Sequence, residues 1–522
     1  MKSYTQKLIL SSFFLLFSFT GHLNAQVISS GEIDRLVTNT MKTFDVPGIA
    51  LAIVKDGKVI HSKGYGVRSL TSGEKTDEHT LFAIASNSKA FTAAALAILI
   101  DEGKLKWDDK VNYYIPEFKL YNPYVSDEFT IRDLLTHRSG LGLGAGDLMI
   151  WPGGAEFTTD EIIHNLRYLK PVSGFRTKFD YDNLLYIVAG EVIKRVSGIS
   201  WEEFIETRIM RPLGMTGSAA SYTRIKDKSN VIDPHAPVNG GLKVIDRDIS
   251  EPANAAGGIY SNIVDMCKWV NTQLNEGVIQ NTGKQLFSKS QHSEMWSAQT
   301  ILPVNTQPPY NSHFGAYGLG WLLTDVKGYK QVSHTGGLAG IVTQVTLIPE
   351  MKLGIIVLTN QQSGYAFTAI TNTIKDRFFG IKGIDRIKQN EENFHSAQKE
   401  AMEVTQGIWK TIEEAQKNNP YNSENVFTGT YNDLWFGDVV IKKEGNKLIF
   451  ESQKSRRLKG EMLPYKGNTF IVKWDDRSLD ADAFAMFVLD NEGNASSFKM
   501  KAISPLTDFS FDFHDLDLNR KK

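Results

Sequence analysis

The chain has 522 residues, with 41% hydrophobic and 11% aromatic side chains and a formal net charge of −1. A chain of this length exceeds what one hydrophobic core usually serves, so two or more domains are expected. The near-neutral charge provides no basic footprint for DNA or RNA, so we expect no nucleic-acid partner. The single cysteine, Cys267, excludes intrachain disulfides and argues against thiolate metal sites.

The N-terminus has the three parts of a secretory signal. Lys2 and Lys7 precede an apolar run at residues 8–19, and Leu-Asn-Ala at 23–25 offers a small-residue cleavage site. This arrangement predicts a signal peptide over residues 1–25. The alternative, a membrane anchor, needs about 20 apolar residues, and this run is shorter. We therefore expect an exported protein, periplasmic or secreted, with no membrane span in the mature chain.

A short amphipathic stretch at 32–44 is followed by a strong hairpin signal. Apolar runs at 49–54 and 59–61 flank the dipeptide Asp56-Gly57, which is typical of a tight turn between two strands. The middle of the chain is mostly helical. Apolar helices are predicted over 90–102 and 184–196, each followed by a glycine that ends it.

Strands return downstream at 330–333, 341–348 and 353–358. The sequence therefore predicts an α+β fold, in which an antiparallel sheet is assembled from both chain ends and flanked by helices and a helical subdomain. A further helix, 367–379, returns to cover this sheet. Residues 386–419 are rich in charged and amide side chains, which predicts a helical linker.

The C-terminal hundred residues alternate short apolar runs with turns, which predicts a separate small all-β domain. The pattern leaves open whether that domain is a sandwich or a barrel. The predicted runs are 439–441, 447–450, 470–474, 483–489 and 498–503. We expect this domain to shape substrate access or assembly without supplying chemistry.

Ser86 and Lys89 form the strongest candidate for a nucleophile and its base. They lie one helical turn apart, after an apolar stretch at 81–85 and at the start of a long apolar helix. A serine at a helix N-terminus has its own N–H and the helix dipole to stabilise an oxyanion. Burial of Lys89 would lower its pKa toward the value that a general base needs.

The spacing Ser-x-x-Lys alone carries little information, because it recurs at three other places. Those pairs fall in a turn, in the polar linker and in the β domain, so we interpret them as surface coincidences. They are Ser72/Lys75, Ser396/Lys399 and Ser496/Lys499.

A Ser/Lys pair needs a proton relay to the leaving group, and the segment Tyr181-Asp182-Asn183 offers one. A second segment, Tyr260-Ser261-Asn262, has the same Tyr-x-Asn pattern, and local context separates the two poorly. Either tyrosine could instead be a structural aromatic.

The third element is the segment Ser333-His334-Thr335-Gly336-Gly337, on the strand that opens the downstream meander. Paired glycines allow a close approach of backbone to ligand, and their N–H groups can complete an oxyanion hole. The alternative is a strand end with a satisfied histidine.

These three elements, in this order and at domain-scale spacing, resemble those of the serine β-lactamase and penicillin-binding protein superfamily. The resemblance points to its class C and DD-peptidase-like branch, which includes esterases and D-amino peptidases. It covers about residues 32–380 and assigns Tyr260 to a structural segment. The tail resembles the lipocalin-like domain often appended to such hydrolases. Supporting segments are 130–141, 257–261 and 317–321.

Together these observations predict four parts: a signal peptide (1–25), a β-lactamase-like hydrolase domain (26–385), a helical linker (386–424) and a lipocalin-like β domain (425–522). The sequence makes no prediction of oligomeric state.

The resemblance also implies roles at the site. Ser86 is the acylated nucleophile and Lys89 the base that activates it. Tyr181 relays the proton to the leaving group and helps to activate the deacylating water. Asn183 orients Lys89 and hydrogen-bonds the substrate amide. One nucleophile, one base and one relay suffice for acyl transfer, and no metal or other cofactor is required.

The backbone N–H groups of Ser86 and Gly337 are implied as the oxyanion hole, and His334 as electrostatic support for Tyr181. The histidine is a departure from the superfamily, because most true β-lactamases have lysine at this position. A permanent cation for the antibiotic's carboxylate is thereby replaced by a group that can be neutral at pH 7. Peptidase or esterase activity is favoured over efficient antibiotic hydrolysis.

The sequence thus predicts an exported serine hydrolase acting on a small-molecule or peptide substrate, either peptide amides, including those with D-residues, or esters. Two alternatives stay open: a β-lactamase, or a penicillin-recognising sensor that is acylated without turnover. A metal hydrolase is disfavoured because His-Glu-x-x-His does not occur. An α/β-hydrolase is disfavoured because Gly-x-Ser-x-Gly does not occur.

Overall fold

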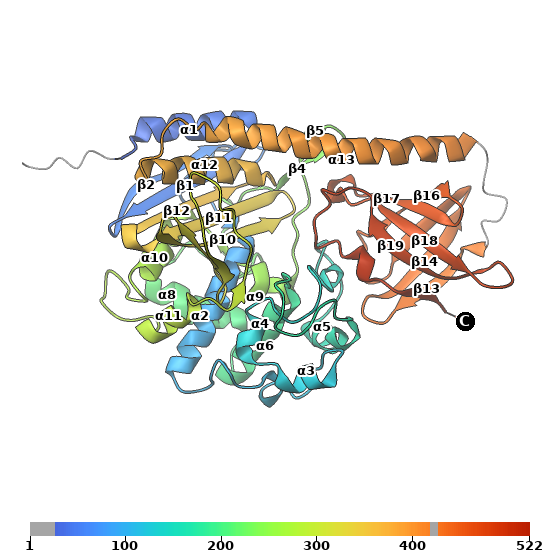
Figure 1. Ribbon diagram of the computed structural model, residues 1–522, viewed down its shortest axis with the longest axis horizontal. Coiled ribbons are helices and arrows are strands. Elements are labelled where there is room, and N and C mark those ends of the chain that lie inside the picture. Colours follow the sequence, from blue (N-terminus) through green and yellow to red (C-terminus); the bar gives the residue numbers. More distant parts are fainter. Residues whose placement is uncertain (1–26, 418–425, 522) are drawn as a thin grey trace, which may run out of the picture.

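The protein is described from a computed structural model, which places residues 27–417 and 426–521 (Figure 1). The predicted signal peptide and the end of the predicted linker lie outside these residues. Among the helices within them, none is both long enough and apolar enough to cross a membrane.

The predicted sheet is present and is built from both ends of the first domain. It has eight strands in the order β2-β1-β12-β11-β10-β9-β8-β7. The N-terminal hairpin, β1 (Gly48–Lys55) and β2 (Lys58–Gly66), joins the later meander because β1 pairs antiparallel with β12 (Leu353–Thr359). The remaining strands of this sheet are β7 (Thr300–Ile301), β8 (Gly315–Tyr317), β9 (Leu322–Val326), β10 (Tyr329–Leu338) and β11 (Ile341–Ile348). The α+β fold class is therefore confirmed.

The central strand β1 is apolar on both faces because helices cover both. Successive side chains of a strand point to opposite faces. Leu51 and its alternate neighbours pack into a core with α1 (Ser30–Thr43) and α12 (Gly364–Phe378). Ala52 and its alternate neighbours pack into the larger core on the opposite face, where α10 (Ile263–Leu274) lies against the strand.

A helical subdomain is inserted between the two halves of the sheet. Its central helix, α2 (Ser88–Asp101), is apolar nearly all round and buried, as a helix enclosed by protein must be. It packs against α6 (Leu184–Ser197) and α9 (Asn254–Gly257). The other helices of this domain are α3 (Pro123–Glu128), α4 (Ile131–Leu134), α5 (Thr159–Asn165), α7 (Trp201–Phe204), α8 (Arg211–Leu213) and α11 (Lys289–Met295). Two short pairs of strands complete it: β3 (Phe82–Ala83) with β6 (Tyr260–Ser261), and β4 (His235–Val238) with β5 (Gly241–Val244).

The C-terminal domain is a closed eight-stranded antiparallel barrel, which resolves the choice between sandwich and barrel and is consistent with the lipocalin-like expectation. Aromatic rings fill its interior; Tyr431, Phe487 and Phe498 contact one another. Its strands are β13 (Gly429–Asp433), β14 (Gly437–Glu444), β15 (Lys447–Ser452), β16 (Lys459–Lys466), β17 (Thr469–Trp474), β18 (Ala483–Leu489), β19 (Ala495–Ala502) and β20 (Leu518–Arg520).

The predicted linker is one long helix, α13 (Arg386–Lys417), which runs from the first domain across the barrel (Figure 1). Ile408 and Ile412, near its end, pack on Leu463, Ile471 and Ile503 of the barrel. Most of the other side chains of α13 are polar and exposed, as expected for a helix that packs against protein on one side only.

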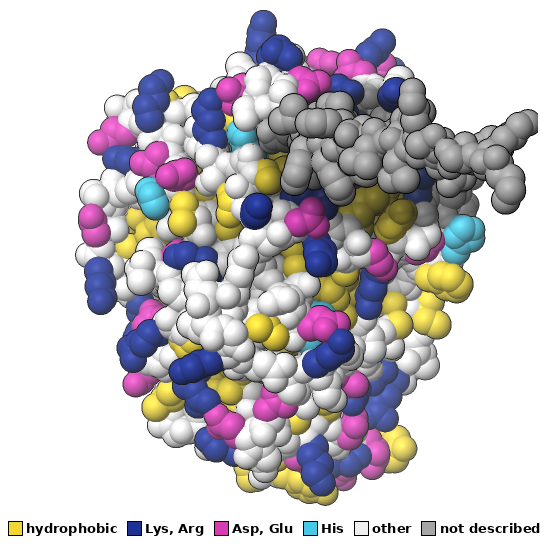
Figure 2. All heavy atoms as spheres, turned by 90° about the vertical axis from the view of Figure 1, so that its left-hand side faces the viewer, with side chains coloured by type: hydrophobic (Ala, Val, Ile, Leu, Met, Phe, Trp, Pro, Cys, Tyr) yellow, Lys and Arg dark blue, Asp and Glu magenta, His cyan; other side chains and the backbone are white. Residues whose placement is uncertain are grey.

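The surface of the molecule carries mixed charge. Figure 2 shows lysine and arginine side chains interspersed with aspartate and glutamate on the face that it displays. No continuous basic area is visible on that face, which agrees with the near-neutral composition.

Candidate active site

Ser86 lies in a single 3-10 turn, Ala85–Asn87, directly before α2. The preceding residue, Ala85, has a φ of 48°, a left-handed conformation that is strained for a residue with a side chain. Strand β10 crosses this turn so closely that a Cβ on Gly336 would lie 2.3 Å from the carbonyl oxygen of Ile84. The glycine therefore allows the strand to pass beside the serine.

Lys89 lies one turn further on and is completely buried. Its Nζ donates hydrogen bonds to Ser86 Oγ (3.1 Å), Asn183 Oδ1 (2.7 Å) and the carbonyl oxygen of Ala256 (2.9 Å). Burial lowers the pKa of Lys89 to about 7, although the charges of Asp147 and Asp182 act in the opposite direction. A large fraction of Lys89 is therefore an unprotonated amine at neutral pH, beside the hydroxyl it would activate.

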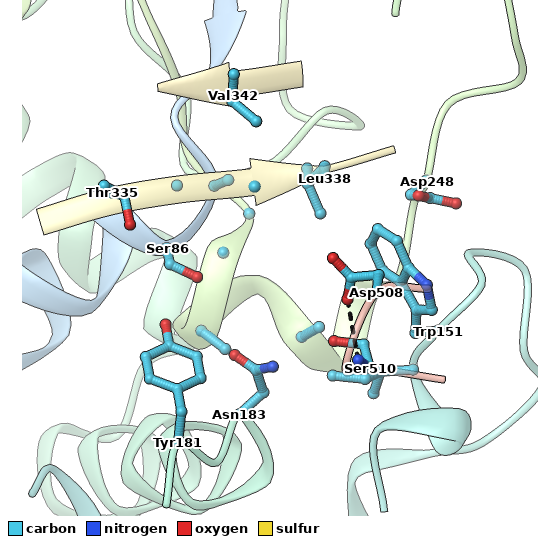
Figure 3. A pocket seen from close by; sticks show the side chains of 18 of the residues that line it. Ser86, Trp151, Tyr181, Asn183, Asp248, Thr335, Leu338, Val342, Asp508 and Ser510 are labelled. Carbon is cyan, nitrogen blue, oxygen red and sulfur yellow. Dashed lines mark hydrogen bonds between the residues drawn. The ribbon is translucent and has the colours of Figure 1, made fainter. Parts of the chain in front are cut away.

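Tyr181 and Asn183 come from the loop that leads into α6. Tyr181 directs its hydroxyl toward Ser86 (Figure 3) and interacts with that side chain. Burial raises the pKa of Tyr181 well above its usual value, so it is a phenol at neutral pH. Asn183 donates from Nδ2 to Asp147 Oδ2 at 2.8 Å while its Oδ1 accepts from Lys89. The amide is thus fixed from both ends.

His334 lies on β10 and makes two hydrogen bonds. Its Nδ1 donates to the carbonyl oxygen of Thr335 at 2.6 Å, and its Nε2 accepts from the Tyr317 hydroxyl at 2.9 Å. Burial lowers the pKa of His334 to about 3, so the ring is neutral at pH 7. The ring centroids of Tyr181 and His334 are 6.3 Å apart. Any support that His334 gives Tyr181 is therefore that of a neutral ring held through Tyr317, and its role stays a prediction.

Gly337 lines the same cavity as Ser86, Tyr181, Asn183 and His334, so the structure brings the predicted site residues together. The cavity has a volume of about 530 Å³, within the usual range for small-molecule sites. Pairing of β10 with β9 ends at Ser333, which leaves residues 334–338 as an edge along the cavity. The N–H groups of Ser86 and Gly337 remain the predicted oxyanion donors.

The three other Ser/Lys pairs lie away from this cavity, and all three serines are exposed. Lys399 and Lys499 form ion pairs with Glu403 and Asp517. Tyr260 also lines the cavity. It belongs to the short strand β6, which pairs with β3, and this agrees with the expectation that its segment is structural.

Several residues at the site were not predicted from sequence. His137 stacks on Tyr181 with ring centroids 4.2 Å apart, and its Nδ1 accepts from the backbone N–H of Asp182. Asp147, which holds Asn183, is completely buried, and burial raises its pKa to about 8. Ser510 and its neighbours reach the cavity from the C-terminal domain. Only His137 had a signal in the sequence, because it lies within the segment 130–141.

Within the described ranges, no group of three or more His, Cys, Asp or Glu side chains is arranged to hold a metal ion. The arrangement that the site does show is a serine hydroxyl between an amine and a phenol, facing a cavity. It can carry out nucleophilic acyl transfer.

Comparison with known proteins agrees with this fold. The family described as Beta-lactamase matches residues 33–376, and a domain of unknown function (DUF3471) matches residues 414–520. The chain is 26% identical over 484 residues to the unguisins hydrolase ungD' of Aspergillus campestris, covering 89% of this chain and 88% of that protein. It is 27% identical over 346 residues to protein flp of Staphylococcus aureus, covering 65% and 64%.

Among solved structures, the octameric penicillin-binding protein homologue from Pyrococcus abyssi is similar in fold. The TM-score is 0.60 at 22% identity, over 94% of this chain and all of that one. This likeness extends over both domains.

Proposed function

The chain belongs to the β-lactamase family, and on that premise we propose that it is an exported serine hydrolase that cleaves peptide amides or esters through an acyl-enzyme on Ser86. The observation that carries the proposal is that the buried Lys89 Nζ lies at hydrogen-bond distance, 3.1 Å, from Ser86 Oγ, so the amine can accept the serine proton once it is neutral. The named hydrolase among the relatives supports hydrolysis as the reaction class. Export rests on the signal sequence predicted at residues 1–25.

The proposed mechanism begins with the neutral amine of Lys89. It takes the proton of the Ser86 hydroxyl as the serine oxygen attacks the substrate carbonyl, and the resulting oxyanion is stabilised by the N–H groups of Ser86 and Gly337. Tyr181 passes a proton to the departing amine or alkoxide, which breaks the scissile bond and leaves the acyl-enzyme. A water molecule then gives a proton to the same relay as it attacks the ester carbonyl. The bond from the acyl group to Ser86 Oγ breaks, the relay returns the proton to Oγ, and the carboxylic acid product leaves free Ser86.

The charges around the cavity support a substrate without a carboxylate. Among the residues that the structure describes, no lysine or arginine lines it, and His334 is neutral. The acidic residues among them are Asp248, which is paired with Arg457 at 2.7 Å, and Asp508. A negatively charged substrate group would meet no cation on these walls.

We expect aminoacyl amides or esters to turn over rapidly, and β-lactams to act as slow acylators or poor substrates. The measurement is steady-state and burst kinetics with D- and L-aminoacyl amides, esters and a chromogenic cephalosporin, with mass spectrometry of the intact chain. Rapid multiple turnover of the cephalosporin, with no amide or ester hydrolysis, would restore β-lactamase as the function. A stable adduct without turnover of any substrate would indicate a sensor.

A substitution at His334 tests the charge argument. We expect His334→Lys to raise the ratio of kcat/KM for carboxylate-bearing over neutral substrates by about tenfold, because an ammonium group attracts a carboxylate. His334→Ala should lower turnover of neutral substrates by about 10²-fold, the scale on which enzymes lose rate when one positioned acid–base or electrostatic group is removed. Equal losses for both substrate classes in His334→Lys would contradict the charge argument.

A further inference from the structure

The loop between β19 and β20, residues 503–517, leaves the barrel and enters the active-site cavity. Asp508, Phe509 and Ser510 line that cavity together with Tyr181 and Asn183, and Figure 3 shows Asp508 and Ser510 near Trp151. The Phe509 ring meets the Tyr181 ring edge to face, with centroids 5.8 Å apart. The C-terminal domain therefore forms part of the cavity wall.

We propose that this β19–β20 loop gives the C-terminal domain a function in the reaction: it positions Asp147 and, through it, Asn183 and Lys89. The proposal rests on the proposed function, because it concerns the same site. It makes Asp147, Ser510 and Asp512 positioning residues, and it assigns a role to a domain for which the family match names none.

The first contact clamps the backbone around Asp147. Asp512 is completely buried, and its two carboxylate oxygens accept hydrogen bonds from the backbone N–H of Gly146 (2.6 Å) and of Leu148 (3.1 Å). Gly146 has a φ of 77°, and a Cβ there would lie 2.5 Å from Leu184 Cδ1, so the turn is pressed against the start of α6. A buried carboxylate is costly unless its oxygens are bonded, so these bonds fix both partners.

The second contact fixes the Asp147 side chain. Asp147 Oδ2 accepts from the Ser510 hydroxyl and from Asn183 Nδ2, each at 2.8 Å. Its Oδ1 is buried without a hydrogen-bond partner in the described part of the chain. One continuous series of hydrogen bonds thus runs from Ser510 through Asp147, Asn183 and Lys89 to Ser86.

The series acts on the position of Lys89 more than on its charge. A negative Asp147 raises the pKa of Lys89 against the effect of burial. Burial raises the pKa of Asp147 to about 8, however, so Asp147 carries little charge below pH 7, and loss of the Ser510 hydroxyl would raise that pKa further. The loss would therefore change where Asn183 and Lys89 are held and leave the charge that faces Lys89 on the acid side nearly the same. The other ionisable groups that face Lys89 or Asp147 are His137, Tyr181, Asp182, Tyr186, His334 and Asp512.

The test uses the full chain with Ser510→Ala and a matched control, Ser496→Ala, which removes an exposed barrel hydroxyl that bonds only to the Val488 carbonyl among the described residues. We expect Ser510→Ala to lower kcat/KM for an aminoacyl ester by about 10- to 100-fold, since small misplacements of reacting groups cost this much. We expect the loss to fall on kcat and on the rate of Ser86 acylation, with KM little changed, because this series of hydrogen bonds orients the reacting groups. The control should match the unmodified protein in these constants, and both variants should stay folded.

Asp512→Asn is the second variant. The two oxygens of Asp512 each accept from a backbone N–H, and an amide would replace one of these acceptors with an NH₂ group, so that one of the two hydrogen bonds would be lost. We expect an equal or larger loss of kcat/KM and slower acylation of Ser86. If this variant fails to fold, the result for Ser510→Ala alone tests the proposal. A Ser510→Ala enzyme with unchanged kcat/KM, or with its loss confined to KM, would overturn the proposal while leaving the hydrolase assignment intact. Absence of turnover in the unmodified protein would instead remove the proposed function itself.

Discussion

Ser86→Ala is expected to lower turnover of amide or ester substrates by about 10⁴-fold or more, the scale of removing a nucleophile that acts as one unit with its base. The structure gives the reason, because both the Lys89 amine and the Tyr181 phenol interact with this hydroxyl. Without Ser86 Oγ neither has an atom to activate. An acylating probe should label the unmodified protein at Ser86, and the variant should take up no label.

Two exposed serines serve as controls for this assignment. Ser72 and Ser496 have the same spacing to a lysine as Ser86, but both lie on the surface away from the cavity. Alanine at either position should leave turnover and labelling unchanged. A peptide map with the adduct on Ser72 or Ser496 would refute Ser86 as the nucleophile.

Local patterns were enough to predict most of the first domain. The β1–β2 hairpin followed from two apolar runs around Asp56-Gly57, and α2 followed from an apolar run ended by Gly103. The closure of the C-terminal strands into a barrel could not be predicted in the same way. Alternation with period two reports which face of a strand is buried, and it is the same in a sandwich and in a barrel.

The site divides in a similar way. Ser86 and Lys89 could be predicted because they are one helical turn apart in sequence, so local geometry places them together. Tyr181 could be separated from Tyr260 only by the family resemblance, and both indeed line the cavity. The role of Ser510 could not be predicted from the sequence, since Ser510 bonds to a residue 363 positions away and lies in no motif. Contacts of this kind depend on how two domains dock, which no periodicity reports.

The pH dependence of the reaction should follow Lys89. Burial lowers the pKa of this amine to about 7, so the amine is protonated below that pH and cannot accept the Ser86 proton. We therefore expect kcat/KM to fall tenfold per pH unit on the acid side, with a midpoint near pH 7. A stopped-flow pH profile of acylation with an uncharged ester measures this limb directly. An unperturbed lysine would place the midpoint above pH 10.

Lys89→Met is the variant that assigns this limb, because methionine fills a similar volume without an amine. We expect it to lower acylation by about 10³-fold, within the range for loss of a positioned general base. The acid limb should disappear from the remaining activity, since the titrating group is gone. Folding should be retained, because the substitution removes a buried amine whose burial disfavours its charged form.

Lys330→Met is the control. Burial lowers the pKa of Lys330 as it does that of Lys89, although Lys330 is only partly buried. Its amine bonds to the Trp296 carbonyl, and Lys330 does not line the cavity. If Lys89→Met kept an acid limb near pH 7, the base would be another group. Asp147 and Asp182, whose pKa values burial raises to about 8 and about 7, would then be the candidates.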